Sequence, residues 1–143
     1  MTIHLKWMQK ALDAAETRCG FCAPNPSVGA VLVSSAGECI GTGTHWACGY
    51  NHAERDAIEK AGEVPPGATL YVTLEPCTMC AGAISFARIR RLYYGAEDEK
   101  GGGVDHGVRF FSQPTCHHAP DIYGGILERQ AGELLRAFFK RRR

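Results

Sequence analysis

Two stretches of the chain share one design: "HAERDAIEKAG" (residues 52–62) and "LEPCTMCAGAI" (residues 74–84). Apolar residues recur at helical spacing in both stretches, which predicts two short helices. Each helix carries side chains that bind soft metal ions where it begins: His52 in the first, and Cys77 and Cys80 in the second. A fold that brings the two helix starts together would therefore create a metal site.

The remaining elements are predicted from periodicity and from turn residues. An amphipathic pattern around Leu5 to Ala15 predicts a first helix, and residues 126–139 predict a last one. Between them we expect a hairpin of "VGAVLV" and "ECIGTGT", a buried strand "TLYVTL", a fourth strand "IRRLYYG" and a loop-rich stretch over 95–124. This order predicts an α/β fold, a three-layer α/β/α sandwich around a mixed central sheet, formed by one domain spanning 1–143.

Composition excludes several classes of protein. Of the 143 residues, 45% are hydrophobic and 22% charged, which is typical of a globular domain. No segment approaches the roughly 18 consecutive apolar residues of a membrane span, so no membrane partner is expected. The first residues carry Asp13 and Glu16 on a helical pattern and do not read as a secretion signal. Seven cysteines then favour a cytoplasmic location, where thiols bind metal or lie buried.

Positive charge is concentrated in the second half of the chain. Residues 1–87 hold five basic and eight acidic side chains, whereas residues 88–143 hold eleven basic and seven acidic ones. The sequence ends in "FFKRRR" (residues 138–143). This basic tail permits a polyanionic partner, although a solvated helix end would look the same.

The ligand types point to one zinc ion per chain. Zinc binds imidazole nitrogen and thiolate sulfur in tetrahedral geometry, and catalytic sites use three protein ligands plus a water molecule. His52, Cys77 and Cys80 supply three ligands. A helix N-terminus favours the thiolate form of both cysteines.

Glu54 decides between a structural and a catalytic site. Lying two residues after His52, it can reach the open corner of the metal without binding it. Zinc lowers the pKa of a bound water, and a nearby carboxylate can take its proton and return it to a leaving group. This chemistry suits hydrolytic loss of ammonia from an amidine-like carbon. Two alternatives stay open: Glu54 as merely a first-turn glutamate favoured by the helix dipole, and Cys48 as a fourth ligand that makes the zinc structural.

"HAE" together with "PCTMC" resembles the signature of the cytidine deaminase superfamily. The resemblance implies a cytidine deaminase-like fold, His52, Cys77 and Cys80 as zinc ligands, Glu54 as the proton shuttle, and hydrolytic deamination of a nucleobase.

From Ala68 onward the chain is similar to bacterial tRNA adenosine deaminases, which convert the wobble adenosine of an anticodon to inosine and work as homodimers. The resemblance implies that a tRNA anticodon stem-loop is the partner. It also implies a group of nucleic-acid contacts: Asp98, Lys100, Phe138, Phe139, Lys140, Arg141, Arg142 and Arg143.

The first half resembles a different branch of the superfamily. "APNPSVGAVLV", "GTGTH" and "GYNHAE" are similar to the deaminase domain of the bifunctional riboflavin-pathway enzyme. This resemblance implies that Asn25 and His45 face the substrate base, although a histidine at a strand end is also commonly a satisfied structural residue. The tRNA enzymes usually carry Asn at the position of His45, and the riboflavin enzymes carry a longer insertion between their two cysteines.

Three hypotheses for function follow. The first is conversion of adenosine to inosine in a tRNA anticodon loop. The second is deamination of a small phosphorylated aminopyrimidine or another free nucleobase or nucleoside. The third is a zinc-held RNA-binding module without catalytic activity.

Overall fold

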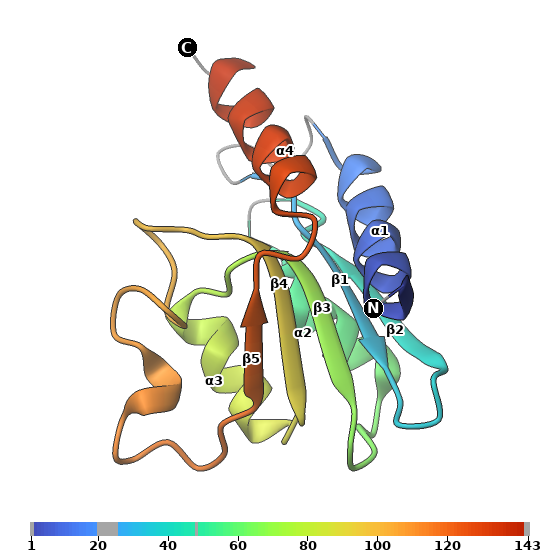
Figure 1. The fold of residues 1–143 in the computed structure, drawn as a ribbon, viewed down its shortest axis with the longest axis vertical. Helices are drawn as coiled ribbons and strands as arrows, with labels where there is room; N and C mark the ends of the chain where they lie inside the picture. Colours follow the sequence, from blue (N-terminus) through green and yellow to red (C-terminus); the bar gives the residue numbers. More distant parts are fainter. Residues whose placement is uncertain (1, 20–25, 48, 142–143) are drawn as a thin grey trace.

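A five-stranded mixed sheet runs through the middle of the protein in the order β2-β1-β3-β4-β5 (Figure 1). The computed structural model describes residues 2–19, 26–47 and 49–141. β1 pairs antiparallel with both β2 and β3, whereas β3, β4 and β5 run parallel. The strands are β1 (Gly29–Val33), β2 (Cys39–Thr44), β3 (Thr69–Leu74), β4 (Arg91–Ala96) and β5 (Asp121–Gly124).

Helices cover both faces of this sheet. α1 (Thr2–Glu16) and α4 (Glu128–Arg141) pack on the face turned toward the viewer in Figure 1. α2 (Ala53–Ala61) and α3 (Thr78–Phe86) lie on the far face, and the short 3-10 helix η1 (Phe110–Ser112) packs against α3. The predicted three-layer α/β/α sandwich is therefore confirmed.

β1, β3 and β4 are buried on both faces because their alternate residues enter two separate cores. Leu32 and Leu70 pack with the alanines of α2 and α3, whereas Val31 and Tyr71 pack on the other face with Trp7 of α1. Each of these side chains is at most 7% exposed. Continuous apolar runs are the sequence pattern expected for strands covered on both faces.

The sequence prediction missed one strand. Residues 121–124 fall in the stretch expected to be loop-rich, yet they form β5 and pair parallel with β4 from Arg91↔Asp121 to Tyr94↔Gly124. β5 is an edge strand of four residues and none of them is fully buried, so it lacks the apolar signature of the other strands. Within the described ranges, no helix is long and apolar enough to cross a bilayer.

β2 and α2 approach each other more closely than side chains would allow. A Cβ atom on Gly43 would lie 2.1 Å from the carbonyl oxygen of Ala53, and one on Gly41 would lie 2.3 Å from that of Ala57. The two glycines of "GTGT" therefore let α2 rest directly on the sheet along its length. This contact fixes the position of the residues at the start of α2.

Candidate functional site

His52 and Cys77 occupy equivalent places in the fold, each as the residue that caps the N-terminus of a helix. Cys80 follows one turn into α3 and is buried. The ligand atoms of these three residues all lie within 4.8 Å of one another. Nδ1 of His52 is 3.6 Å from Sγ of Cys77 and 3.4 Å from Sγ of Cys80. The two helix starts therefore meet at one point, as the sequence pattern predicts.

These distances match the edges of a tetrahedral zinc site. With Zn–S about 2.3 Å and Zn–N about 2.0–2.1 Å, tetrahedral angles place sulfur and nitrogen about 3.5–3.6 Å apart. The donor set of one imidazole and two thiols is also the one that zinc prefers. Among the described residues, a second cluster of metal-binding type combines the exposed Glu97 and Glu99 with His106, whose ring is already bonded to Glu75. The first cluster is the better fit to zinc.

The surroundings of Cys77 favour its thiolate form, which is the form that binds a metal. A hydrogen bond from Cys80 lowers the pKa of Cys77 to about 4, whereas the same bond and burial raise the pKa of Cys80. The hydrogen bond to Cys77 raises the pKa of His52. One thiolate is thus already favoured before a metal arrives, and a metal ion would take the place of the shared proton.

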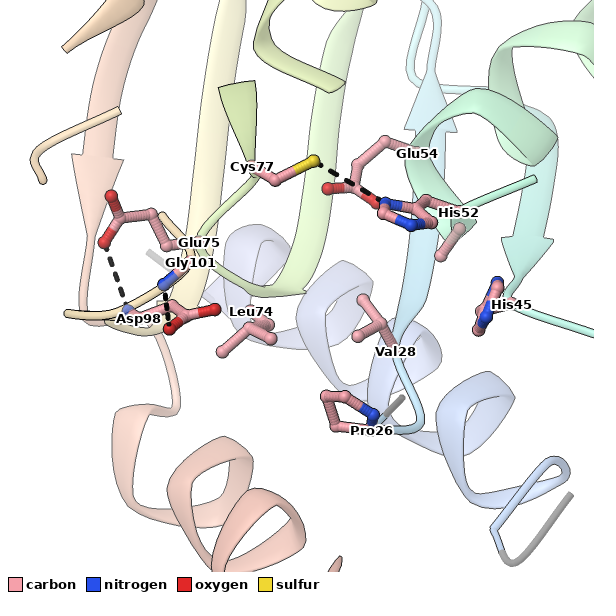
Figure 2. A pocket seen from close by; sticks show the side chains of 11 residues that line it. Pro26, Val28, His45, His52, Glu54, Leu74, Glu75, Cys77, Asp98 and Gly101 are labelled. Carbon is pink, nitrogen blue, oxygen red and sulfur yellow. Dashed lines mark hydrogen bonds between the residues drawn. The ribbon is translucent and has the colours of Figure 1, made fainter. Parts of the chain in front are cut away.

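Glu54 lies on the first turn of α2 with its carboxylate turned toward Cys77 and the His52 ring (Figure 2). Glu54 is buried and only 4% exposed. Burial raises the pKa of the Glu54 carboxyl to about 7, and the charge of Cys77 adds to this effect. A carboxyl group with such a pKa can both accept and release a proton near neutral pH.

A pocket of about 250 Å³ opens beside this group (Figure 2). It is smaller than the roughly 300–1,000 Å³ of sites that enclose drug-sized ligands, which suits one heterocyclic ring. Val28 and Leu74 supply apolar walls, so a flat ring would meet apolar surface on entering. The lining is completed by Pro26, His45, His52, Ala53, Glu54, Glu75, Cys77, Asp98 and Gly101.

His45 lies in the wall of this pocket and is 3% exposed. Its Nδ1 is 2.9 Å from the carbonyl oxygen of Asn51. Because a carbonyl oxygen only accepts, Nδ1 carries the hydrogen in this bond. The His45 and His52 rings meet edge to face with centroids 5.3 Å apart. His45 therefore combines a structural hydrogen bond with a place in the pocket wall.

Glu75 is a part of the site that the sequence analysis missed. Its carboxylate has a side-chain exposure of 0%. It accepts hydrogen bonds from the backbone N–H groups of Asp98, Val104, Asp105 and His106 and from Nδ1 of the His106 ring. These bonds tie the loop after β4 to the strand that precedes Cys77. The available signal was a charged residue directly after the buried run "TLYVTL".

The residues expected to contact nucleic acid fall into two groups. Asp98 lines the pocket, and its Oδ1 accepts hydrogen bonds from the backbone N–H groups of Lys100 and Gly101. Lys100 itself is exposed. The second group lies on α4, where Phe139 is 53% exposed, Phe138 is half-buried and Lys140 is exposed. Arg141 is the last residue of α4.

Some sequence predictions fall on residues that the structure does not describe. Asn25, Arg142 and Arg143 lie outside the described residues, as does Cys48, the alternative fourth ligand. Their roles stay predictions.

Comparison with known proteins places this site in a family. Residues 1–96 match the cytidine and deoxycytidylate deaminase zinc-binding region. A tRNA-specific adenosine deaminase of Agrobacterium fabrum is 68% identical over 97 residues, a match that spans 64% of this chain and 64% of that relative. Another from Rickettsia bellii is 38% identical over 149 residues, covering 94% of this chain and 98% of the relative.

Both resemblances expected from the sequence are confirmed by these comparisons. A solved structure from a study of A-to-I editing by tRNA:A34 deaminases at the wobble position is 48% identical, with a TM-score of 0.76 over 90% of this chain and 98% of that chain. Acinetobacter baumannii RibD is 32% identical, with a TM-score of 0.82 over 97% of this chain but only 39% of that longer chain. The chain belongs to the cytidine and deoxycytidylate deaminase zinc-binding family and is a zinc-dependent hydrolytic deaminase.

Proposed function

We propose that the protein deaminates adenosine to inosine in the anticodon loop of a tRNA. The observation that carries the chemistry is the buried Glu54 carboxyl beside the cluster of His52, Cys77 and Cys80. The substrate is supported by the 68% identity to a tRNA-specific adenosine deaminase. We further propose that the chain acts as a homodimer, as its resemblance to the tRNA enzymes implies.

The proposed roles follow from the geometry. His52, Cys77 and Cys80 would hold the zinc, which when bound would make a water acidic enough to serve as a nucleophile near neutral pH. Glu54 accepts a proton from the attacking water as its oxygen joins C6 of adenine, and passes that proton to the adjacent ring nitrogen. Glu54 then takes the second proton of the same water from the new C6 hydroxyl and delivers it to the departing amine, so that the C–N bond breaks as the C6 carbonyl forms. The net reaction consumes one water and releases ammonia, leaving a carbonyl at C6.

The pocket supports the entry of a single base. Its apolar walls, Val28 and Leu74, can contact the face of a ring, and His45 adds a polar side chain to the same lining. Because an unpaired loop base costs little to flip out, the enzyme needs no large surface for opening a duplex. Phe139 and Lys140 on α4, with the arginines that follow, are proposed to contact the stem-loop.

Replacing Glu54 with Gln tests the assignment. The variant should retain one zinc per chain, because no ligand changes, while turnover of an anticodon stem-loop falls by at least about a thousandfold. Zinc is measured by atomic absorption and inosine by mass spectrometry. Loss of zinc, or activity within tenfold of the parent, would contradict the proposed role of Glu54.

A second candidate is deamination of a small phosphorylated aminopyrimidine. It is favoured by His45, which ends the "GTGTH" stretch and lines the pocket, and by the TM-score of 0.82 to Acinetobacter baumannii RibD. Turnover of the diaminopyrimidine without turnover of the stem-loop, unchanged on deletion of residues 140–143, would favour it over the tRNA substrate.

A further inference from the structure

The connection between β2 and α2, which starts at the pocket residue His45 and leads to His52, carries two exposed aromatic side chains. Trp46 is 54% exposed and Tyr50 is 63% exposed. Trp46 directly follows His45, a residue of the pocket wall, and Tyr50 precedes the candidate ligand His52 by two residues. Large aromatic side chains that stay exposed in a segment that also supplies pocket residues are typical of a binding surface.

Arg18 holds Trp46 in place from the end of α1. Its Nε and Nη2 donate to the carbonyl oxygen of Trp46 at 3.1 and 2.6 Å. Its Cζ also lies 3.6 Å from the centroid of the indole ring. The ring is therefore oriented by a cation at one face while more than half of the residue remains open. A pre-oriented ring loses little conformational freedom when a partner stacks on it.

We propose that Trp46, backed by Arg18, is a stacking platform for an unpaired base that neighbours the target nucleotide in an RNA loop. This inference rests on the proposed function. An adenine that enters the pocket must leave its stack, so its neighbours lose a stacking partner. Proteins that bind single-stranded RNA replace that partner with aromatic rings, often next to arginine.

The platform should favour substrates that carry flanking nucleotides, without favouring any one neighbouring base. Stacking is tolerant of sequence because every base has a flat face. A free nucleobase has no neighbour to place on Trp46, so only a substrate with flanking nucleotides gains from the platform. The guanidinium of Arg18 also places positive charge at the platform, which favours a polyanionic partner.

The tryptophan content of the chain makes the platform directly observable. The sequence has two tryptophans, and Trp7 is buried at 7% exposure. Zinc-loaded protein is titrated with an anticodon stem-loop that carries inosine at the target position, so that no turnover occurs. Tryptophan emission should be quenched in the parent, and the quenching should disappear in Trp46→Phe.

Kinetics on the adenosine-containing stem-loop provide the second readout. Trp46→Leu keeps apolar bulk but cannot stack a base, so KM should rise by about tenfold or more while kcat stays within about twofold. Trp46→Phe should restore most of the loss. Tyr123→Ala, which removes a 44% exposed aromatic on β5, is the matched control and should leave both constants unchanged.

The outcomes separate the two ideas. RNA turnover with a normal KM in Trp46→Leu and no Trp46-dependent quenching would overturn the platform and leave the proposed function intact. Quenching that depends on Trp46 in a protein without RNA turnover would support the platform and overturn the proposed function. Absence of both signals would overturn both.

Discussion

Removal of the Glu75 carboxylate should loosen one wall of the pocket without touching the zinc ligands. In Glu75→Ala, the five hydrogen bonds that end on this carboxylate are removed, four from backbone N–H groups and one from the His106 ring. The backbone N–H of the exposed Asp105 can bond to water instead, but that of Val104 cannot, because Val104 is buried. The loop carrying Asp98 and Gly101 should therefore lose its anchor.

The size of the effect follows from burial. An orphaned buried N–H costs about 1–3 kcal/mol, and the half-buried donors add less because water can reach them. Together they should lower the free energy of unfolding by about 2–4 kcal/mol. For a chain of this length, that corresponds to a fall in Tm of roughly 5–12 °C. Glu75→Gln should cost only about 1–2 kcal/mol, because the amide oxygen keeps one set of acceptor bonds.

Thermal unfolding of the zinc-loaded proteins measures the stability, and amide hydrogen exchange locates the change. Exchange should accelerate in residues 98–106 of Glu75→Ala while α2 stays protected. KM for the stem-loop should rise, since Asp98 and Gly101 line the pocket. An unchanged Tm together with unchanged exchange in this loop would refute the anchoring argument.

Three further results are expected. Gly43→Ala should destabilise the fold by about 3 kcal/mol and weaken zinc binding, because its Cβ would meet the Ala53 carbonyl oxygen at 2.1 Å and displace the start of α2. The control is Gly82→Ala, a helix position where the nearest neighbour of the new Cβ would be 3.8 Å away. Urea unfolding should show this control to be slightly more stable than the parent. Burial works against ionisation of Glu75, yet the His106 ring and backbone N–H groups lower its pKa, while Glu75 raises the pKa of His106. The stability that ionised Glu75 contributes is present above its ordinary pKa of 4.5 and is lost as pH falls through its lowered pKa. The stability that protonated His106 contributes is present below its ordinary pKa of 6.5 and is lost as pH rises through its raised pKa. The stability difference between parent and His106→Ala should therefore be largest between pH 4.5 and 6.5 and shrink on both sides, and a difference independent of pH would contradict the pairing. Deletion of residues 140–143 should weaken stem-loop binding and reduce the slope of log affinity against log salt by about 0.7–0.9 for each phosphate that the tail neutralises, measured by filter binding, whereas an unchanged slope would remove the tail from the interface.

Local patterns were sufficient to predict most of the fold. β1, β3 and β4 are continuous apolar runs, and α2 and α3 begin at the ligands that the motif contains, so periodicity and turn residues located them. β5 escaped because Asp121 and Tyr123 face solvent and only pairing with β4 makes the segment a strand. Its register is a tertiary property, which single-sequence patterns do not contain.

The site was predictable only where its parts are close in sequence. The short spacing within each pair identifies these residues in the sequence: His52 with Glu54, and Cys77 with Cys80. The bonds from Glu75 to the loop at 98–106 cross more than 20 residues, and the contact between Arg18 and Trp46 crosses 28. Nothing in the spacing of such residues indicates that they meet. These long-range interactions depend on how the sheet and helices are stacked.

The shortness of β5 limits how two copies of this protein can associate. An outer strand with unpaired peptide groups can recruit a strand from another molecule, and proteins avoid this by keeping such strands brief or charged. β5 has four residues and begins with the exposed Asp121. It offers too few free backbone groups for a second sheet to extend from it. Two copies of the chain should therefore not associate by continuing the sheet across β5, so this outer strand stays a boundary of the subunit.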